Sequence, residues 1–187
     1  MWVELTSSTG ATIRLYQLYR CIAHPRLESS VFQQQQQNYF LSRGDNRDPC
    51  SALLEDLANE IQQYEGQKTV VMGDFNENIS SNAIQEWSGM LGLQEATSAS
   101  IGKNKGTHCS NQHDCQINGI FSDLPLSSAG ITDFGIFNHR TLWMNLSLTT
   151  AFGFHYQSPH PLPTQQLYLH KVQAVDWYHA SLSDAIF

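Results

Sequence analysis

A carboxylate and an amide directly follow a predicted strand in the stretch "KTVVMGDFNENIS", residues 68–80. Residues 69–72 are apolar or β-branched and predict a short buried strand. Because side chains alternate along a strand, we expect Asp74 and Asn76 to point the same way and Phe75 to point toward the core. Polar groups at the rim of a sheet commonly bind ligands or take part in catalysis. The plain alternative is a turn after a strand, where Gly, Asp and Asn are frequent.

The neighbouring segments predict elements that would hold this strand. The segment "ATIRLYQLYR" predicts a strand that forms a hairpin with "WVELT". Apolar residues from 53 to 61 are spaced as one face of a helix, with Asp48 as its N-cap, Pro49 at its first position and its end near Gly66. A second helix is predicted over "NAIQEWSGMLGL", and strands are predicted over "CQINGIF" and "TLWMNLSLT". The chain is therefore predicted to mix helices and strands.

Composition predicts two regions without a core of their own. The five-glutamine tract in "VFQQQQQNYF" is expected to be a loop insert. The proline-rich "SPHPLPTQQ" follows a boundary that we place near residue 150. We therefore expect one domain over 1–150, and a linker with a terminal helix over 151–187.

Charge and cysteine content narrow the partners and the compartment. The net charge is -7, so the surface as a whole should repel nucleic acid unless a local basic patch binds it. No apolar run is long enough to span a bilayer, and the first residues do not resemble a signal peptide. Four scattered cysteines agree with a reducing compartment. We expect an intracellular protein, and a nuclear location is compatible with this expectation.

One cluster has the residue types of a zinc site. The segment "THCSNQHDC" contains His108, Cys109, His113 and Cys115, whose side chains can all bind zinc. Their spacing matches no standard zinc pattern, so we interpret the segment as a polar loop and keep a zinc-binding module as a third hypothesis.

Three short segments occur in order along the chain: "GDFN" at 73–76, "INGIF" at 117–121 and "NHRTLW" at 138–143. They resemble the endonuclease/exonuclease/phosphatase family, and in particular the endonuclease-like domains of retroelements, and the likeness extends to "LYQLYR" and "DPCSALLEDL". The resemblance implies an α/β (α+β) fold with a two-layer β-sandwich flanked by helices. It also implies Mg²⁺-dependent phosphodiester hydrolysis, with Mn²⁺ as a substitute, on DNA, and a reverse transcriptase downstream in a longer polypeptide.

The resemblance assigns roles to individual residues. Asp74 would bind the metal and orient or deprotonate the attacking water, and Asn76 would hydrogen-bond the scissile phosphate. His139 would contact that phosphate and stabilise developing charge, and Tyr19 would also contact it. Asn138 would lie in the metal-binding wall.

Two asparagines depart from the family pattern, which has aspartate at both positions. Asn118 stands where the aspartate would support a positively charged His139, and Asn138 where a carboxylate would face the metal. An amide can orient a histidine but does not stabilise its imidazolium form. Mg²⁺ also favours carboxylate ligands. Apart from this role, the pair Asn118-Gly119 is a strong hairpin-turn signal, although the apolar residues around it indicate a strand interior.

The first part of the family pattern has no counterpart in this sequence. Family domains begin with an asparagine on a strand and a metal-binding glutamate, and Glu4 is not assigned to that role because it lies in the predicted hairpin. We expect an N-terminally truncated domain, about the C-terminal two-thirds, whose first sheet has an unpaired edge. Two hypotheses follow: a retroelement-derived endonuclease with weak or lost activity, and a non-catalytic remnant with at most weak nucleic-acid binding.

Overall fold

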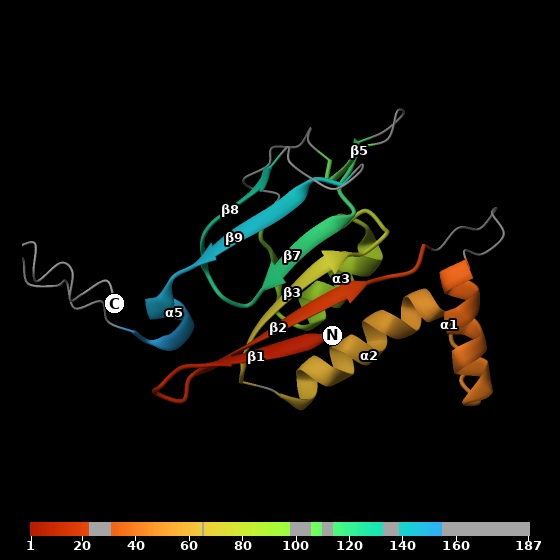
Figure 1. Cartoon of the computed structure of the whole chain (residues 1–187), viewed down its shortest axis with the longest axis horizontal. Helices are drawn as coiled ribbons and strands as arrows, with labels where there is room; N and C mark the ends of the chain where they lie inside the picture. Colours follow the sequence, from red (N-terminus) through yellow and green to blue (C-terminus); the bar gives the residue numbers. More distant parts are fainter. Residues whose placement is uncertain (23–30, 65, 98–105, 110–113, 133–138, 155–187) are drawn as a thin grey trace, which may run out of the picture. The chain divides into compact units, whose positions relative to one another are not determined.

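The computed structural model describes residues 1–22, 31–64, 66–97, 106–109, 114–132 and 139–154, with the backbone alone at residues 109 and 114. Helices and strands alternate along this part of the chain (Figure 1). The strands are β1 Trp2–Thr6, β2 Thr12–Tyr19, β3 Lys68–Asp74, β4 Gln94–Glu95, β5 His108–Cys109, β6 Asp114–Cys115, β7 Asn118–Ser122, β8 Leu126–Thr132 and β9 Thr141–Leu146. The helices are α1 Val31–Ser42, α2 Pro49–Gln63, α3 Asn82–Met90 and α5 Leu148–Phe152.

A five-stranded sheet with the order β1-β2-β3-β7-β4 forms the centre of the described fold. The predicted hairpin is confirmed, since β1 and β2 pair antiparallel and Glu4 lies opposite Arg14. The carboxylate of Glu4 accepts a 3.0 Å hydrogen bond from Arg14, so this acid has a structural role. Strand β3 runs parallel to β2 and antiparallel to β7. The α+β class with two sheets and flanking helices is confirmed.

Helices α2 and α3 cover one face of this sheet. Helix α2 begins as predicted, because the side chain of Asp48 accepts a hydrogen bond from the Ser51 amide and Pro49 occupies the first turn. Ser81 caps α3 in the same way. The apolar faces of both helices pack on a core that includes Val71 of β3, Phe121 of β7, Phe75 just after β3, and Trp87 of α3. The predicted burial of Phe75 is confirmed.

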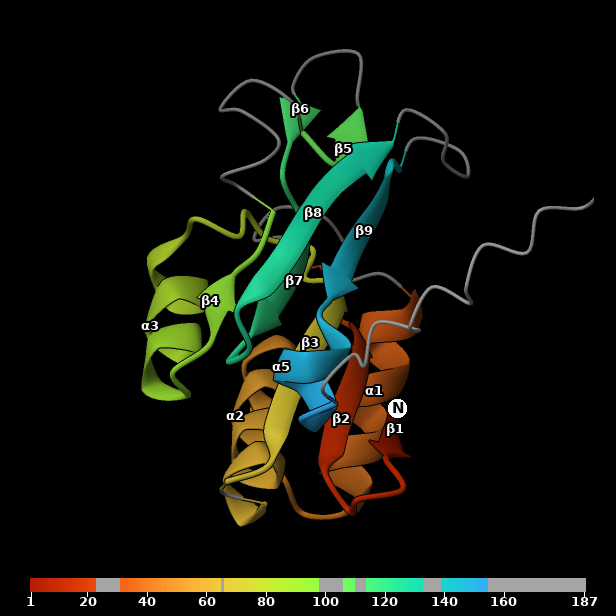
Figure 2. The ribbon, with the colours of Figure 1, turned by 90° about the vertical axis from the view of Figure 1, so that its left-hand side faces the viewer.

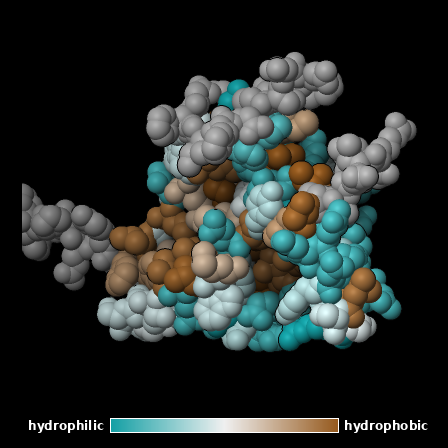
Figure 3. Space-filling view, turned by 45° about the vertical axis from the view of Figure 1, so that its right-hand side comes forward, coloured by the Kyte–Doolittle hydropathy of each residue, from teal (hydrophilic) through white to brown (hydrophobic). Residues whose placement is uncertain are grey.

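The opposite face carries the second, smaller sheet. Strands β8 and β9 pair antiparallel, and together with α5 they lie in front of the central sheet in Figure 2. Their apolar side chains pack with Ile13, Val70 and Ile120 of the central strands. The covering sheet has two strands and the central sheet has five. Large apolar side chains are exposed at several places, including Val3, Leu5 and Trp143. On the face seen in Figure 3, apolar side chains gather on the left and around the centre, and polar side chains are more frequent below and to the right.

The prediction of a loop over the glutamine tract is wrong. Residues Val31–Ser42 form helix α1, which has no buried residue. Glutamine is a good helix former, and composition alone does not separate a solvated helix from a loop. Phe32, at the start of the helix, packs edge-on against Tyr19 of β2, with 5.5 Å between ring centroids, and at the other end Arg43 donates locally to the hydroxyl of Tyr39 over 2.7 Å.

Strand β8 was not predicted, because its sequence "LSSAGIT" is poor in residues that favour strands. It is held by pairing with β9 and by close packing at Gly130. A Cβ atom added there would lie 2.8 Å from the indole of Trp143. Tertiary packing thus decides this strand.

The structure tests the prediction for Asn118-Gly119 but not the prediction of a boundary near residue 150. Asn118-Gly119 begins strand β7 and pairs with β3, so the hairpin-turn alternative is excluded. The predicted boundary near residue 150 and the terminal helix concern mainly residues 155–187, which lie outside the described residues, so both stay predictions. None of the described helices is long and apolar enough to cross a membrane.

Candidate active site

An open pocket of about 310 Å³ lies where β3 and β7 meet beside the segment that leads into β9. Its lining includes Asp74 at the end of β3, Asn118 at the start of β7, and His139 with Arg140 before β9. Residues that are far apart in the sequence therefore surround one cavity. Three of the residues that the resemblance singled out lie in it.

Gly73 makes the approach of β3 to β2 close enough to place Asp74 at this rim. Its φ of 154° is one that side-chain-bearing residues rarely adopt, and an added Cβ would lie 2.0 Å from the carbonyl oxygen of Leu18. On its other side β3 pairs with β7, and there Gly73 lies opposite Gly119. The glycine pair thus lies directly beside a pair of polar residues, because Asp74 and Asn118 are opposite each other in the next register position.

His139 lies between the amide of Asn118 and the carboxylate of Asp74. The Nδ1 atom of its ring is 3.2 Å from Nδ2 of Asn118 and 3.9 Å from Oδ2 of Asp74. The first distance is a hydrogen bond, and the second is too long for one. The Oδ1 atom of Asn118 is buried without a hydrogen-bond partner. The geometry can therefore orient the imidazole beside a carboxylate.

Asn76 is not among the residues that line the pocket with Asp74 and His139. Its backbone amide donates to Oδ1 of Asp74 over 2.9 Å, and its side-chain Nδ2 donates to the carbonyl of Arg20 over 2.6 Å. Its φ of 48° lies in the left-handed region, so the strand alternation ends at Asp74. The prediction that Asn76 points the same way as Asp74 assumed that the strand continues to Asn76, whereas β3 ends at Asp74. One proton of the Nδ2 amide stays available for a ligand, since an amide group has two donors.

Thr107 joins the segments that carry Asn118 and His139, and sequence reasoning missed it. This residue is fully buried, and its hydroxyl oxygen accepts from the amides of Ile117 and Asn118 over 3.0 and 2.9 Å. Its carbonyl accepts from the amide of Arg140 over 2.8 Å. One side chain and one carbonyl thus fix the register between the two pocket walls. A single threonine in a polar segment gives no sequence signal for this role.

His108 packs against His139 and was assigned only to the zinc hypothesis. Their ring centroids are 5.0 Å apart in an edge-on arrangement, and their backbones form a bridge. Among the described residues, no three His, Cys, Asp or Glu side chains lie close enough together to hold a metal. His113 lies outside the described residues and the Cys109 side chain is not described, so the zinc hypothesis stays a prediction.

The roles predicted for the two remaining site residues, Tyr19 and Asn138, are not tested by the structure. Tyr19 pairs with Asp74 in the β2–β3 register, which places both on one face of the sheet, but its side chain is 56% exposed and packs on Phe32. Asn138, assigned to the metal-binding wall, lies outside the described residues. Both roles stay predictions.

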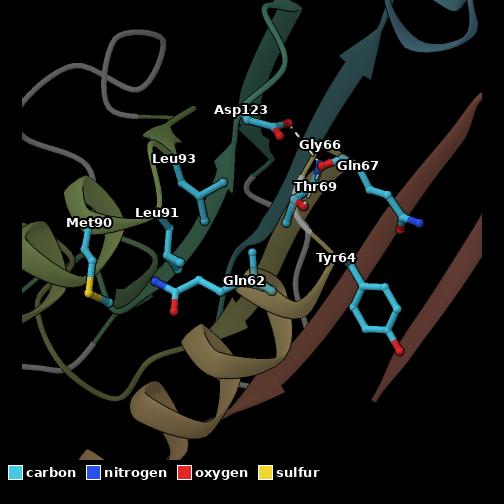
Figure 4. A pocket seen from close by; sticks show the side chains of 10 residues that line it. Gln62, Tyr64, Gly66, Gln67, Thr69, Met90, Leu91, Leu93 and Asp123 are labelled. Atoms are coloured by element: carbon cyan, nitrogen blue, oxygen red, sulfur yellow. Dashed lines mark hydrogen bonds between the residues drawn. The ribbon is translucent and has the colours of Figure 1, made fainter.

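The larger hollow, of about 480 Å³, lies elsewhere, at the other end of β3 (Figure 4). Figure 4 shows Leu91, Leu93 and Gln62 around it, with the Asp123 carboxylate hydrogen-bonded to the backbone of Thr69. That bond, 2.9 Å long, continues the pairing between β3 and β7, so Asp123 has a structural role. This hollow contains none of the residues that the resemblance singled out, and we place the candidate site in the smaller pocket.

The donor atoms of the smaller pocket suit a hard cation, but only in part. Mg²⁺ prefers carboxylate and other oxygen ligands, and needs several of them. Asp74 supplies the one carboxylate that lines this pocket in the described part of the chain, and the unpartnered Oδ1 of Asn118 is a further oxygen. Such a set fits a weakly bound cation whose other ligands are water or substrate oxygens.

No protein-family model matches the sequence, and no curated protein matches it. Among solved structures, an endonuclease/exonuclease/phosphatase family protein from Leptotrichia buccalis C-1013-b has a TM-score of 0.51 and 14% identity, over 78% of this chain and 52% of that one. A beta toxin from Staphylococcus aureus, solved with bound magnesium ions, has a TM-score of 0.46 and 8% identity, over 77% and 52%. A mannosyl-6-phosphatase from Bacteroides thetaiotaomicron has 0.43 and 11%, over 77% and 51%.

The match to the Leptotrichia protein covers 78% of this chain and about half of the neighbour's own length. At this level of identity the similarity concerns the fold. It agrees with the arrangement of the two sheets and the flanking helices. The chain therefore has the fold of endonuclease/exonuclease/phosphatase family proteins.

Proposed function

We propose that this chain derives from a Mg²⁺-dependent phosphodiesterase of the endonuclease type, from a retroelement, and that its hydrolytic activity is weak or lost. The observation that carries the proposal is the meeting of Asp74, Asn118 and His139 in one pocket at the rim of a family-like sheet. The substrate class is a phosphodiester, with DNA as the polymer and a reverse transcriptase as the partner domain.

In this proposal Asp74 has two tasks. Its Oδ1 atom is held by the amide of Asn76, which leaves Oδ2 facing His139 and the cavity. That oxygen can accept a proton from an attacking water or bind a cation. A bound Mg²⁺ or Mn²⁺ would neutralise charge on the phosphate, and Asp74 is the described residue that would hold it.

His139 and its neighbours bind the phosphate in this proposal. The Nδ2 atom of Asn118 lies 3.2 Å from Nδ1, so with the amide as donor Nδ1 is the acceptor and Nε2 carries the N–H of the ring. A neutral donor stabilises phosphate charge less than an imidazolium does. Arg140 lines the same pocket and contributes a positive charge near the phosphate. The expected result is a phosphate-binding pocket with a reduced rate of hydrolysis.

The second hypothesis is a non-catalytic remnant that retains the fold and binds nucleic acid weakly at most. Two features favour it over an active enzyme: the single carboxylate among the described pocket residues and the amide beside His139. The sequence that flanks the coding region separates the two hypotheses. An open reading frame with a glutamate-bearing strand upstream and a polymerase downstream supports the endonuclease, and a stop codon on either side supports the remnant.

A thermal-shift experiment tests the site directly. We expect Mg²⁺ or Mn²⁺ to raise the melting temperature of the full chain by mass action, and Asp74→Ala to abolish the rise. Asp123→Ala, which changes the carboxylate by the other hollow, serves as the control and should keep the cation-dependent rise while lowering the basal melting temperature. An equal cation-dependent rise in the wild type and in Asp74→Ala would contradict the proposal.

A further inference from the structure

Arg20 contacts Asp74, the last residue of β3, and the three residues that follow it. Its backbone amide donates to the carbonyl of Asp74 over 2.9 Å, and its own carbonyl accepts from Nδ2 of Asn76 over 2.6 Å. Its guanidinium donates to the carbonyl of Phe75 over 3.5 Å and forms a short ion pair with Glu77. One residue thus touches four consecutive residues, two of which are candidate catalytic groups.

The guanidinium is buried, and Arg20 is not among the residues that line the pocket. Only 7% of the side chain is exposed, and its Nε donates to the carbonyl of Cys50 in the first turn of α2 over 2.8 Å. A buried charge is tolerated when it is paired and hydrogen-bonded, and Arg20 meets both conditions. Because the rigid fork holds a helix, a carbonyl and a carboxylate together, residues 74–77 cannot shift without breaking a charge-assisted bond.

We propose that Arg20 and Glu77 form a positioning pair that holds the loop 74–77 in the geometry required for phosphate hydrolysis, an inference that rests on the proposed function. The pair flanks Asn76, whose left-handed φ of 48° is costly for a residue with a side chain: the guanidinium donates to the carbonyl of Phe75 on one side and binds Glu77 on the other. The bond from Asn76 to the Arg20 carbonyl offsets that cost and fixes which amide proton remains available for a ligand. Arg20 itself does not touch the substrate in this proposal.

The test compares Arg20→Met, Arg20→Lys and Glu77→Gln with a matched control, Arg47→Met. Arg47 also forms ion pairs, with Asp45, Glu55 and Asp56, but its side chain is 39% exposed and none of these contacts lines the pocket. The readout is the NMR signal of the Asn76 side-chain amide, together with hydrogen exchange of the backbone amides of Phe75 and Asn76. Both report loop geometry directly and need no catalytic activity.

We expect Arg20→Met to shift the Asn76 side-chain signal and to speed exchange at the two backbone amides by about tenfold or more. Glu77→Gln, which keeps the shape of the side chain, should do the same to a smaller extent. Arg20→Lys should give partial rescue because it retains the charge but not the fork. Arg47→Met should lower the melting temperature without changing either signal.

The proposal is overturned if Arg20→Met and Glu77→Gln lower the melting temperature while the Asn76 signal and the local exchange stay as in the wild type. If Arg20→Met does not fold, Glu77→Gln alone shows whether the Asn76 signal and the local exchange change or stay as in the wild type. If the wild type hydrolyses DNA, the variants should lower kcat more than they raise KM. A wild type without hydrolysis counts against the proposed function, whereas the NMR result still decides the positioning role.

Discussion

The Nδ2 atom of Asn118 lies 3.2 Å from Nδ1 of His139, while the Oδ1 atom of the same amide is buried without a hydrogen-bond partner. An amide N–H directed at Nδ1 makes that nitrogen the acceptor of the pair. A carboxylate at the same place would instead accept a hydrogen bond from an Nδ1–H group. One exchange of an amide for a carboxylate would therefore reverse the direction of the hydrogen bond that orients His139.

Restoring carboxylates is not expected to restore activity by itself. We expect Asn118→Asp combined with Asn138→Asp to leave this chain nearly inactive on plasmid DNA with Mg²⁺, since few carboxylates would hold the cation. Each electrostatic stabiliser is worth about 10²- to 10³-fold in rate, and such effects are strongly non-additive. Adding the N-terminal segment of a family member to the double mutant should restore nicking, and Asp74→Ala should remove it again. Robust nicking by the double mutant alone would show that ligands outside this chain are not needed.

Gly73 is expected to be essential for the fold around Asp74. An alanine there would place Cβ 2.0 Å from a backbone oxygen, which no side-chain movement relieves, so Gly73→Ala should lower the free energy of unfolding by at least about 3 kcal/mol. Gly44 also has a positive φ but has open space around it, so Gly44→Ala should cost about 1–2 kcal/mol. Urea denaturation compares the two, and equal losses would contradict the steric argument.

The hydroxyl of Thr107 is expected to stabilise the junction between Asn118 and His139. Thr107→Val keeps the shape but leaves the amides of Ile117 and Asn118 without an acceptor, at about 1–3 kcal/mol for each. Thr107→Ser keeps the hydroxyl and should lose only about 1 kcal/mol for the missing methyl group. Chemical denaturation measures both variants. If Thr107→Ser is the less stable of the two, packing and not hydrogen bonding explains the residue.

Glu77 should make stability depend on acid pH. Partial burial opposes its ionisation, but hydrogen bonds from Ser81 and Arg20 and the Arg20 charge outweigh burial, so the pKa of Glu77 lies below its usual 4.5. A lowered folded-state pKa contributes stability that is present above pH 4.5 and is lost as the pH falls through the folded value. We therefore expect Glu77→Gln to be less stable than the wild type near pH 7 and the difference to shrink below pH 4.5.

Thermal melting over a pH series measures this difference. Glu55→Gln is the control, because Glu55 is 57% exposed beside Arg47 and a solvent-screened pair contributes little. A difference between wild type and Glu77→Gln that stays constant down to pH 3 would show that ionisation of Glu77 is not its source.

The edge strand β1 should promote self-association. All five of its residues are exposed, including the apolar Trp2, Val3 and Leu5, and among the described strands it pairs with β2 alone. Its one charged residue, Glu4, is already paired with Arg14, so no free charge within the strand opposes edge-to-edge pairing. We expect concentration-dependent association in sedimentation experiments, and Val3→Lys should weaken it. Val31→Lys, on helix α1, is the control and should not change it.

Local patterns were sufficient for the elements whose sequence matches one structural period. The β1–β2 hairpin, the N-cap of α2 at Asp48, and strand β3 leading to Asp74 all follow from alternation or from capping chemistry. These features depend on interactions within a few residues of one another, so the order of residues specifies them. The asparagine at position 118 and its place beside apolar strand residues were visible in the same way.

Tertiary contacts decided what local patterns left open. Helix α1 and strand β8 depend on neighbours distant in sequence, such as Tyr19 for α1 and Trp143 for β8. The approach of His139 to Asn118 requires Thr107 to join their segments. The turning of Asn76 toward Arg20 breaks the alternation that the sequence predicted, because a buried ion pair and a left-handed residue outweigh the strand period at its end.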